Sequence, residues 1–282
     1  MSIDSGTLYI VATPIGNLED FSPRAARILK EVDLIAAEDT RHSKKLLDHF
    51  VIKTPMRSYH DFNQARAESA LVAQLLKGHD VALISDAGTP LISDPGYKLV
   101  KAAHEKHIRV VPVPGPSALI AALSAAGLPT DRVVFEGFVP EKKTARRKHL
   151  ASLASEQRTM IFFEAPHRIA AFLQDAVAVF GPERTATLAR EVTKFHETIR
   201  RDCLQALYQW LCEDREQEKG EFVIVVEGAS PSASPSAPEA DRILAVLLEE
   251  LPLKQAARLA ARITGEKKNA LYRKGLERGE KS

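Results

Sequence analysis

Three short segments rich in glycine, proline and small polar residues each follow an apolar run. They are ATPIGN (12–17), SDAGTPLISDPG (85–96) and VPGPSA (113–118). Glycine lets the backbone approach a ligand closely, and proline fixes the conformation of a loop. Ordinary tight turns would explain any one of these segments alone. Three of them at the ends of neighbouring strands favour a binding site for a small molecule.

None of the three segments has the pattern of a phosphate-binding loop. The sequence contains no GxxxxGK[ST], and no GxGxxG follows the first apolar run. In both motifs the backbone N–H groups and the helix N-terminus bind phosphate. Their absence from the sequence argues against a nucleoside triphosphate or a conventionally bound dinucleotide as the ligand.

The elements that must position these loops alternate between strands and helices. Apolar runs predict strands at 8–12, 34–38, 81–85 and 109–113. Helices are predicted after the Ser22-Pro23 cap, through 69–77, from Asp94-Pro95 through Ala103, and over 116–127. Repeated β-then-α order predicts an α/β fold with a mostly parallel sheet and crossover helices. The strands are apolar on both faces, as a helix-covered sheet requires.

A second block of strands and helices begins near Asp131. Strands are predicted at 133–139, 160–165, 186–192 and 221–228, with helices at about 142–155, 167–179 and 203–216 between them. We therefore predict an α/β domain over 1–118, a second over 119–228, a solvated Ala/Ser/Pro linker over 229–238 and a helical unit over 239–282.

Composition sets further limits on this chain of 282 residues, which is 45% hydrophobic and 27% charged with a net charge of +2. Cys203 and Cys212 match neither a metal-ligand nor a redox spacing, so we expect two reduced, core-facing cysteines on one helix and no bound metal. The N-terminus lacks a signal-peptide pattern, and no apolar run is long enough to span a membrane. We expect a cytoplasmic protein without membrane contact.

Six motifs occur in a specific order: TPIGNLED, AEDTR, SDAGTPLISDPG, VPGPSA, FFEAPHR and GEFVIVVEG. Together they resemble the tetrapyrrole-methylase-like superfamily over roughly residues 7–228. More narrowly, the chain resembles the bacterial small-subunit ribosomal RNA methyltransferases, which 2′-O-methylate a cytidine ribose of 16S ribosomal RNA. The resemblance implies S-adenosylmethionine bound in a cleft between two α/β domains, and a homodimer.

The resemblance also implies which residues bind S-adenosylmethionine. The segment 85–96 corresponds to the loop that cups the methionine and ribose, the start of the helix after 116 contacts the same ligand, and the second domain supplies an apolar adenine slot. The predicted cofactor-binding residues are Pro14, Asp86, Ala87, Gly88, Thr89, Pro90, Ser117, Ala118, Phe162 and Phe163. The first loop, TPIGN, departs from the GxGPG of tetrapyrrole methylases, which favours an RNA acceptor.

Two segments, AEDTRHS (37–43) and FFEAPHR (162–168), each place an acid and an arginine at a strand end. An arginine can hold an RNA phosphate bidentately while a carboxylate orients the ribose. We therefore predict a catalytic, acceptor-side cluster of Asp39, Arg41, Glu164 and Arg168. Taken alone, each has a structural alternative as a helix cap or a surface ion pair. His42 and His167 are candidates for a general base, which stays unassigned.

Two further segments are basic. EKKTARRKHL (141–150) is either a solvated helix face or a phosphate-binding strip, and its lack of aromatics does not indicate base stacking. From Lys254 to Ser282 there are nine lysines and arginines against three glutamates, in two short helices broken at Gly265. Such a helix-turn-helix-like unit suits contacts to RNA backbone. A helical hairpin that only packs on protein is the alternative.

Three functions are compatible with the sequence. The first is an S-adenosylmethionine-dependent 2′-O-ribose methyltransferase acting on 16S ribosomal RNA of the small subunit. The second is a small-molecule methylase of the tetrapyrrole type, which the altered first loop and the basic tail disfavour. The third is a non-catalytic RNA-binding or ribosome assembly factor, which would bind subunits without binding S-adenosylmethionine.

Overall fold

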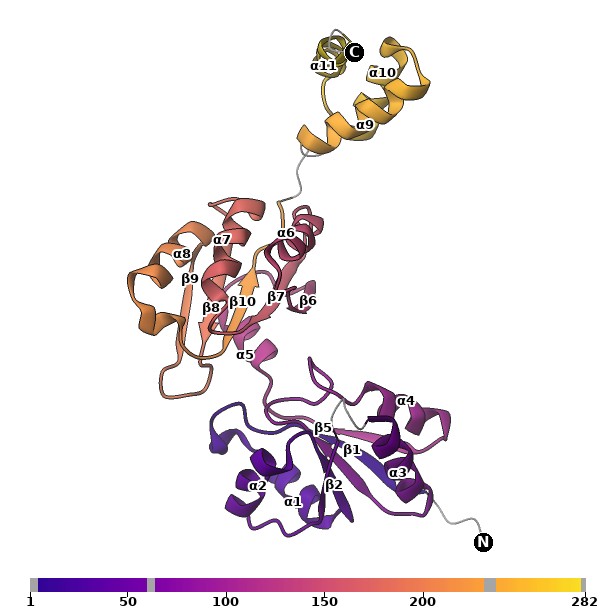
Figure 1. Ribbon diagram of the computed structural model, residues 1–282, viewed down its shortest axis with the longest axis vertical. Coiled ribbons are helices and arrows are strands. Elements are labelled where there is room, and N and C mark those ends of the chain that lie inside the picture. Colours follow the sequence, from indigo (N-terminus) through magenta and orange to yellow (C-terminus); the bar gives the residue numbers. More distant parts are fainter. Residues whose placement is uncertain (1–4, 60–63, 231–236, 280–282) are drawn as a thin grey trace. The chain divides into compact units, whose positions relative to one another are not determined.

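The computed structural model describes residues 5–59, 64–230 and 237–279, which belong to two compact units, Met1–Glu227 and Gly228–Ser282 (Figure 1). The first unit contains two sheets, and the second is helical. None of the helices within these ranges is long and apolar enough to cross a membrane. The predicted domain limits at 118, 228 and 238 stay a prediction, and most of the predicted linker, 231–236, lies outside the described residues.

The first sheet is wholly parallel, as the β-then-α order predicted. Its strands lie in the order β3-β2-β4-β1-β5, so that β1 pairs with β4 on one side and with β5 on the other. The strands are β1 (Thr7–Val11), β2 (Leu34–Ala37), β3 (Met56–Ser58), β4 (Val81–Ile84) and β5 (Arg109–Val113). Every residue of β2 and β4 is buried, which explains why these strands are continuous apolar runs.

Helices cover both faces of this sheet (Figure 1). One face packs on α1 (Pro23–Glu31) and α2 (Thr40–His49), through residues such as Leu29 and Leu47. The other packs on α3 (Gln64–Leu76) and α4 (Tyr97–Glu105), through Leu75 and Leu99. The predicted start of α1 is confirmed, because the Ser22 hydroxyl accepts the backbone N–H of Ala25 and Pro23 occupies the first turn.

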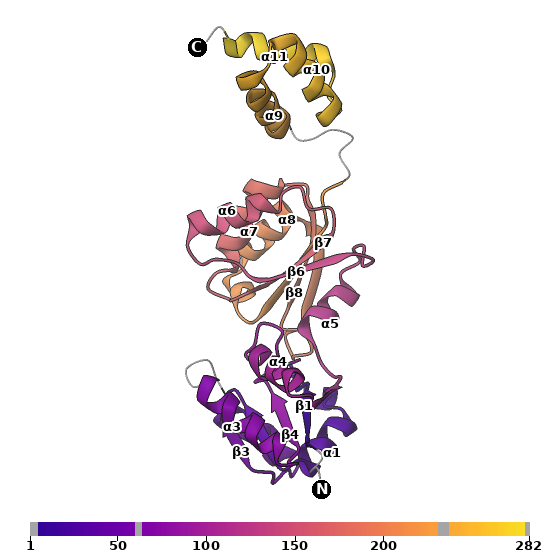
Figure 2. The same ribbon diagram turned by 90° about the vertical axis from the view of Figure 1, so that its right-hand side faces the viewer.

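The second sheet is mixed, with the order β6-β7-β10-β8-β9. Only β6 and β7 pair in parallel, and β10 runs antiparallel to both of its neighbours. The strands are β6 (Val133–Phe138), β7 (Thr159–Glu164), β8 (Thr185–Arg190), β9 (Thr198–Cys203) and β10 (Phe222–Val226). On one face lie α6 (Lys143–Ser152), α7 (Ile169–Phe180) and α8 (Leu204–Glu213), and on the other lies α5 (Ala118–Ala125) (Figure 2).

The second unit is a three-helix cluster formed by α9 (Ala237–Glu250), α10 (Leu253–Thr264) and α11 (Lys268–Gly279). The predicted break at Gly265 is confirmed, because this residue ends α10 in the left-handed conformation. Alanines on α10 allow close packing against Leu244 of α9 and Leu271 of α11. A Cβ added at Gly275 would lie 2.3 Å from Leu253, so α10 and α11 approach each other closely there.

The sequence analysis did not predict two of the strands, and its prediction for the two cysteines differs from the structure. The strand β3 has only three residues, and the edge strand β9 carries Arg200, Arg201 and Asp202, so neither gives an apolar run. Cys203 is the last residue of β9 and precedes the first residue of α8 instead of lying within the helix, and Cys212 is exposed. The expectation of two core-facing cysteines on one helix is therefore wrong.

The basic segment 141–150 contains a buried ion pair, which corrects the interpretation of this whole segment as an RNA-binding strip. Arg146 of α6 is only 5% exposed, and its Nε and Nη2 lie 2.9 and 2.8 Å from Oδ2 of the buried Asp175 on α7. Its Nη1 donates to the carbonyl of Glu141, and Arg147 donates to the other Asp175 oxygen over 2.6 Å. Arg146 thus joins two helices and is not available to bind phosphate.

We expect Arg146→Ala to lower the free energy of unfolding by about 3–5 kcal/mol, because it leaves the Asp175 carboxylate buried without its main partner. Chemical denaturation would measure the change. Lys148→Ala, at an exposed position on the same helix, should change stability by less than about 0.5 kcal/mol. The apolar double variant R146M/D175L should recover most of the loss. Equal effects of Arg146→Ala and Lys148→Ala would contradict the structural role.

Candidate active site

The loops after β1 and β4 are joined by a pair of backbone hydrogen bonds. The N–H of Thr13 donates to the carbonyl of Gly88 over 2.8 Å, and the N–H of Gly88 donates back over 3.0 Å. The buried Thr13 hydroxyl also donates to the carbonyl of Ser85. The hydroxyl of Thr89 donates to the carbonyl of Pro116, which ties in the loop after β5. The three glycine- and proline-rich loops therefore meet at one sheet edge, as predicted.

The loop after β4 has an unusual backbone that the turn residues permit. Gly88 and Gly96 have φ values of +82° and +138°, which favour glycine. Leu91 and Ser93 also have positive φ, at 74° and 68°, where residues with a Cβ are uncommon. Backbone of this kind is often found at ligand-binding sites, where the surrounding structure maintains the strain.

A cavity of about 390 Å³ lies against this loop and is lined by both sheets of the first unit. From the first half of the unit come Ile15, Ala87, Ile92, Ser93, Asp94 and Ala118. From the second half come Phe138, Phe163, Glu164, Ala165, Pro166, Val192, Glu221, Phe222 and Val223. The lining is mostly apolar and includes three carboxyl groups, which suits a ligand with a flat apolar part and a cationic part. We call this the large cavity to distinguish it from the smaller one described below; the more open groove along β5 encloses about 580 Å³.

Three of the ten residues predicted to bind the cofactor line the large cavity: Ala87, Ala118 and Phe163. Gly88 lies directly beside it, since a Cβ at this position would be 3.2 Å from Cγ2 of Ile15. Thr89 and Ser117 instead line a neighbouring apolar groove along β5, and Pro90 is buried.

The structure corrects the placement of Phe162. Successive residues of a strand point to opposite faces, so Phe163 reaches the large cavity while Phe162 points away from it. The Phe162 side chain is fully buried in the core with its ring 5.3 Å from that of Phe172. The motif FFEAPHR could not reveal which of the two rings faces the ligand.

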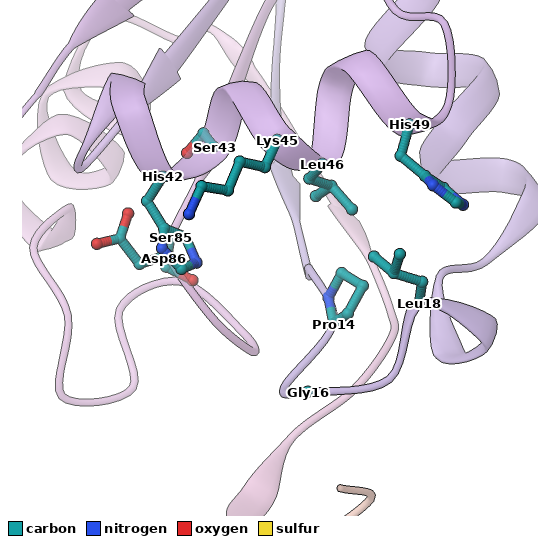
Figure 3. A pocket seen from close by; sticks show the side chains of 10 residues that line it. All are labelled: Pro14, Gly16, Leu18, His42, Ser43, Lys45, Leu46, His49, Ser85 and Asp86. Atoms are coloured by element: carbon teal, nitrogen blue, oxygen red, sulfur yellow. The ribbon is translucent and has the colours of Figure 1, made fainter.

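Pro14 and Asp86 line a second, smaller cavity of about 260 Å³. The loop residues Gly16 and Leu18 form one side of it, and α2 forms the other with His42, Ser43, Lys45, Leu46 and His49 (Figure 3). His42, Lys45 and His49 follow the three- to four-residue spacing of one helix face. The hydroxyl of Ser43 is buried, and no described residue hydrogen-bonds to it. We call this the basic cavity, because His42, Lys45 and His49 outnumber its one acid, Asp86.

Glu164, which lines the large cavity and is buried, forms an ion pair with the half-buried Arg168. The Nε of Arg168 lies 3.0 Å from Oε1 of Glu164, and the same carboxylate accepts the N–H of Ala165. Arg168 also donates to the carbonyl of Val139. Burial raises the pKa of Glu164, while the nearby N–H and Arg168 act in the opposite direction. Both side chains are thus held by the fold itself.

Asp39 and Arg41 have the structural roles that were the alternative to catalysis. The Asp39 carboxylate caps α2 by accepting the N–H of Arg41, which lowers the pKa of Asp39. The Arg41 side chain is 92% exposed and lies 3.5 Å from Asp39. Asp86 accepts the N–H of Asp39 and so fixes the start of α2 beside the loop after β4. Neither Asp39 nor Arg41 lines the two cavities, so the predicted four-residue cluster is not assembled.

Sequence reasoning missed Asp94 and Glu221, two acids that line the large cavity. Burial raises the pKa of Asp94, and the neighbouring Asp86 acts in the same direction, while a hydrogen bond with Ser85 opposes them. Asp94 belongs to the segment SDAGTPLISDPG (85–96), so the sequence could have indicated it as a ligand-binding acid. Glu221 directly precedes β10, far along the chain, and nothing in the sequence indicated that it lines the same cavity.

Of the two candidate bases, His42 lines the basic cavity and His167 lies exposed in the turn before α7. Among the residues that the structure describes, no three His, Cys, Asp or Glu side chains gather as metal ligands would.

Comparison with known proteins identifies the family. A family profile described as "Tetrapyrrole (Corrin/Porphyrin) Methylases" matches residues 7–208, and one described as "RsmI C-terminal HTH domain" matches residues 234–279. The ribosomal RNA small subunit methyltransferase I of Pseudomonas aeruginosa is 55% identical over 282 residues, covering 99% of this chain and 100% of its own. The protein of the same name from Escherichia coli O157:H7 is 53% identical, covering 96% and 95%.

Solved structures confirm the predicted fold. A diphthine synthase superposes with a TM-score of 0.60 at 17% identity, covering 79% of this chain and 90% of its own. A uroporphyrin-III C-methyltransferase from Thermus thermophilus, complexed with S-adenyl homocysteine, superposes with a TM-score of 0.53 at 19% identity, covering 78% and 97%. At such low identity these two similarities concern the fold alone.

The ordered motifs, the two α/β sheets and the relatives that are more than 50% identical over nearly the full length all agree. The chain belongs to the tetrapyrrole methylase family and, within it, to the family of ribosomal RNA small subunit methyltransferase I.

Proposed function

We propose that the protein transfers a methyl group from S-adenosylmethionine to the 2′-oxygen of a cytidine ribose in 16S ribosomal RNA of the small subunit. The observation that carries this proposal is the large cavity, in a chain of this family, with predicted cofactor residues from both sheets in its wall. The substrate follows from the names of the relatives, and the acceptor atom from the resemblance of the ordered motifs.

The residues of the large cavity fit S-adenosylmethionine. Phe163, Val192 and Val223 provide apolar surface for a purine, while Asp94 and Glu221 place carboxyl groups where a cationic ligand gains from them. Tight packing of Gly88 against Ile15 lets the loop backbone form the wall of the cavity. We assign Ala87, Gly88 and Ala118 to one side of the ligand and Phe163 to the other.

When bound, S-adenosylmethionine supplies an electrophilic methyl group on a positively charged sulfur. The chain's own residues then have to orient the ribose hydroxyl and the RNA around it. His42, Lys45 and His49 line the basic cavity, which suits a phosphate of the RNA backbone. Holding both substrates in register can supply a large part of the rate enhancement. Glu164 and Arg168 position the turn after β7 and are not needed as reacting groups in this account.

We also propose that the protein is cytoplasmic and a homodimer, with the helical unit Gly228–Ser282 contacting RNA. A groove along the edge strand β5, lined by Ile10, Ile92 and Ile120, leaves apolar surface available for a second copy of the chain. Ile92 and Ile120 are both exposed in the single chain.

The transfer itself is tested by incubating the protein with methyl-labelled S-adenosylmethionine and either naked 16S RNA, unmethylated small subunits or a porphyrinoid. We expect label in the RNA, at a ribose 2′-oxygen. Label in the porphyrinoid alone would support a small-molecule methylase instead. Binding to subunits without affinity for S-adenosylmethionine would support an assembly factor.

The affinity for S-adenosylmethionine should rise with pH as Asp94 ionises. Burial raises the pKa of Asp94 above its usual value, so the carboxyl group is neutral below that pKa and attracts a cation only above it. Calorimetry should therefore give tighter binding as the pH increases from about 4 toward neutrality. Asp94→Asn should bind about 10–100-fold more weakly at neutral pH and lose this dependence.

Asp131→Asn, at an exposed position outside the large cavity, serves as the matched control for Asp94. It should leave both the affinity and its pH profile unchanged. An unchanged pH profile in Asp94→Asn would remove Asp94 from the cofactor site.

Neutralising the basic cavity should weaken RNA binding alone. Lys45→Gln removes one cation and is expected to reduce the slope of log K against log salt by about 0.7–0.9, the contribution of one phosphate. Affinity for S-adenosylmethionine should not change, since Lys45 does not line the large cavity. Lys98→Gln, at an exposed position on α4, is the matched control. The same salt slope for both variants would place the RNA elsewhere.

A further inference from the structure

The loop between β8 and β9, residues 191–197, presents an aromatic side chain almost entirely to solvent. Phe195 is 96% exposed, the highest value among the exposed large apolar residues of the described chain. Its ring contacts that of His196 edge-on, with the centroids 5.0 Å apart. Its neighbours in the sequence, Lys194, His196 and Glu197, are all polar.

This loop is held firmly in spite of its exposed tip. The Nζ of Lys194 lies 2.9 Å from a carboxylate oxygen of Glu191 and 2.9 Å from one of Glu221. The N–H of Thr193 donates to Glu197 over 2.6 Å. Glu191 and Thr193 both have positive φ, at 50° and 68°. A backbone held in such conformations presents Phe195 in a defined direction.

The loop also contacts the other half of the first unit. The Lys194 side chain packs on Gly16, where an added Cβ would lie 2.3 Å from its Cγ. The hydroxyl of Thr193 donates to the carboxylate of Asp20. Gly16 lines the basic cavity, while Val192 lines the large cavity. The same short loop therefore contributes to the wall of one cavity and packs on the wall of the other.

We propose that Phe195, with His196 at its edge, is a stacking platform for an unpaired nucleobase of the acceptor RNA. This inference rests on the proposed function and adds a positioning contact to it. Single-stranded RNA is recognised by stacking unpaired bases on exposed aromatic rings. An exposed ring between polar residues of the chain suits a base, whose face is apolar and whose edges remain in water. A protein partner would instead require a wider apolar surface around the ring.

The test compares Phe195→Ala, Phe195→Trp and Tyr97→Ala in the full chain. Tyr97 is 69% exposed on α4 and provides a matched loss of an exposed ring. The probes are unmethylated small ribosomal subunits and a short single-stranded oligocytidylate. We expect Phe195→Ala to raise the Kd for both probes about tenfold or more, while Phe195→Trp retains the affinity because any large ring can stack. Tyr97→Ala should bind like the unmodified protein.

Three further measurements separate stacking from other roles of Phe195. For Phe195→Ala, we expect an unchanged Kd for S-adenosylmethionine, an unchanged Tm and an unchanged mass by light scattering. A lower Tm or a lost cofactor affinity would overturn the inference in favour of a structural role. A changed mass would overturn it in favour of a contact between copies of the chain.

The inference and the proposed function fail in different ways. If Phe195→Ala binds and methylates subunits normally, the stacking platform is wrong while the methyltransferase proposal stands. If the unmodified protein places no label in RNA, the proposed function is wrong, whatever the variant does.

Discussion

The two hydrogen bonds between Thr13 and Gly88 are the constraint on which the site depends. The strands β1 and β4 are parallel neighbours, and beyond their ends Thr13 and Gly88 form an isolated antiparallel bridge. Residues close to this pair in the sequence line different cavities. Pro14 and Asp86 line the basic cavity, while Ile15 and Ala87 line the large cavity. The pair thus forms a partition between two cavities of different chemical character.

Charged groups in the first unit divide into those satisfied by the fold and those left for a ligand. Arg146 with Asp175, and Arg168 with Glu164, are ion pairs in which the acid is buried, and losing one partner of such a pair costs far more than losing a surface contact. Asp94 is different, because the groups that act on it are Ser85 and Asp86, neither of which is a cation. Its carboxyl group is therefore available to a cationic ligand, as Lys45 and the two histidines of the basic cavity are to an anionic one.

The alternation of apolar runs and helical patterns predicted the first sheet well, because strands buried on both faces are easily recognised. The edge strands β3 and β9 were not predicted, since one is too short and the other is charged. The convergence of three loops could be predicted from the rule that parallel strands end at one edge. Which side chain of each loop faces which cavity could not, because a shift of one residue reverses the direction, as Phe162 and Phe163 demonstrate.

Residue type alone also could not show which basic side chains are used in ion pairs within the fold and which are available to a ligand. Arg146 and Lys45 are equally basic in the sequence, but Asp175 lies 29 residues from Arg146 and neutralises it across two helices. Only the tertiary structure reveals such a partner. The same applies to Asp39, whose spacing before α2 is equally consistent with a cap and with a catalytic acid.

The partition also limits how an acceptor nucleotide can reach a methyl donor. If the donor lies in the large cavity and a phosphate in the basic cavity, the ribose that joins phosphate to base has to cross near Ile15 and Ala87. Around Gly88 there is little free space, because an added Cβ there would lie 3.2 Å from Cγ2 of Ile15. The loop 191–197 lines the large cavity with Val192 and packs with Lys194 on Gly16, which lines the basic cavity. If the exposed ring of Phe195 stacks on the base, it restricts the base without entering either cavity, and the ribose can still approach the donor in line.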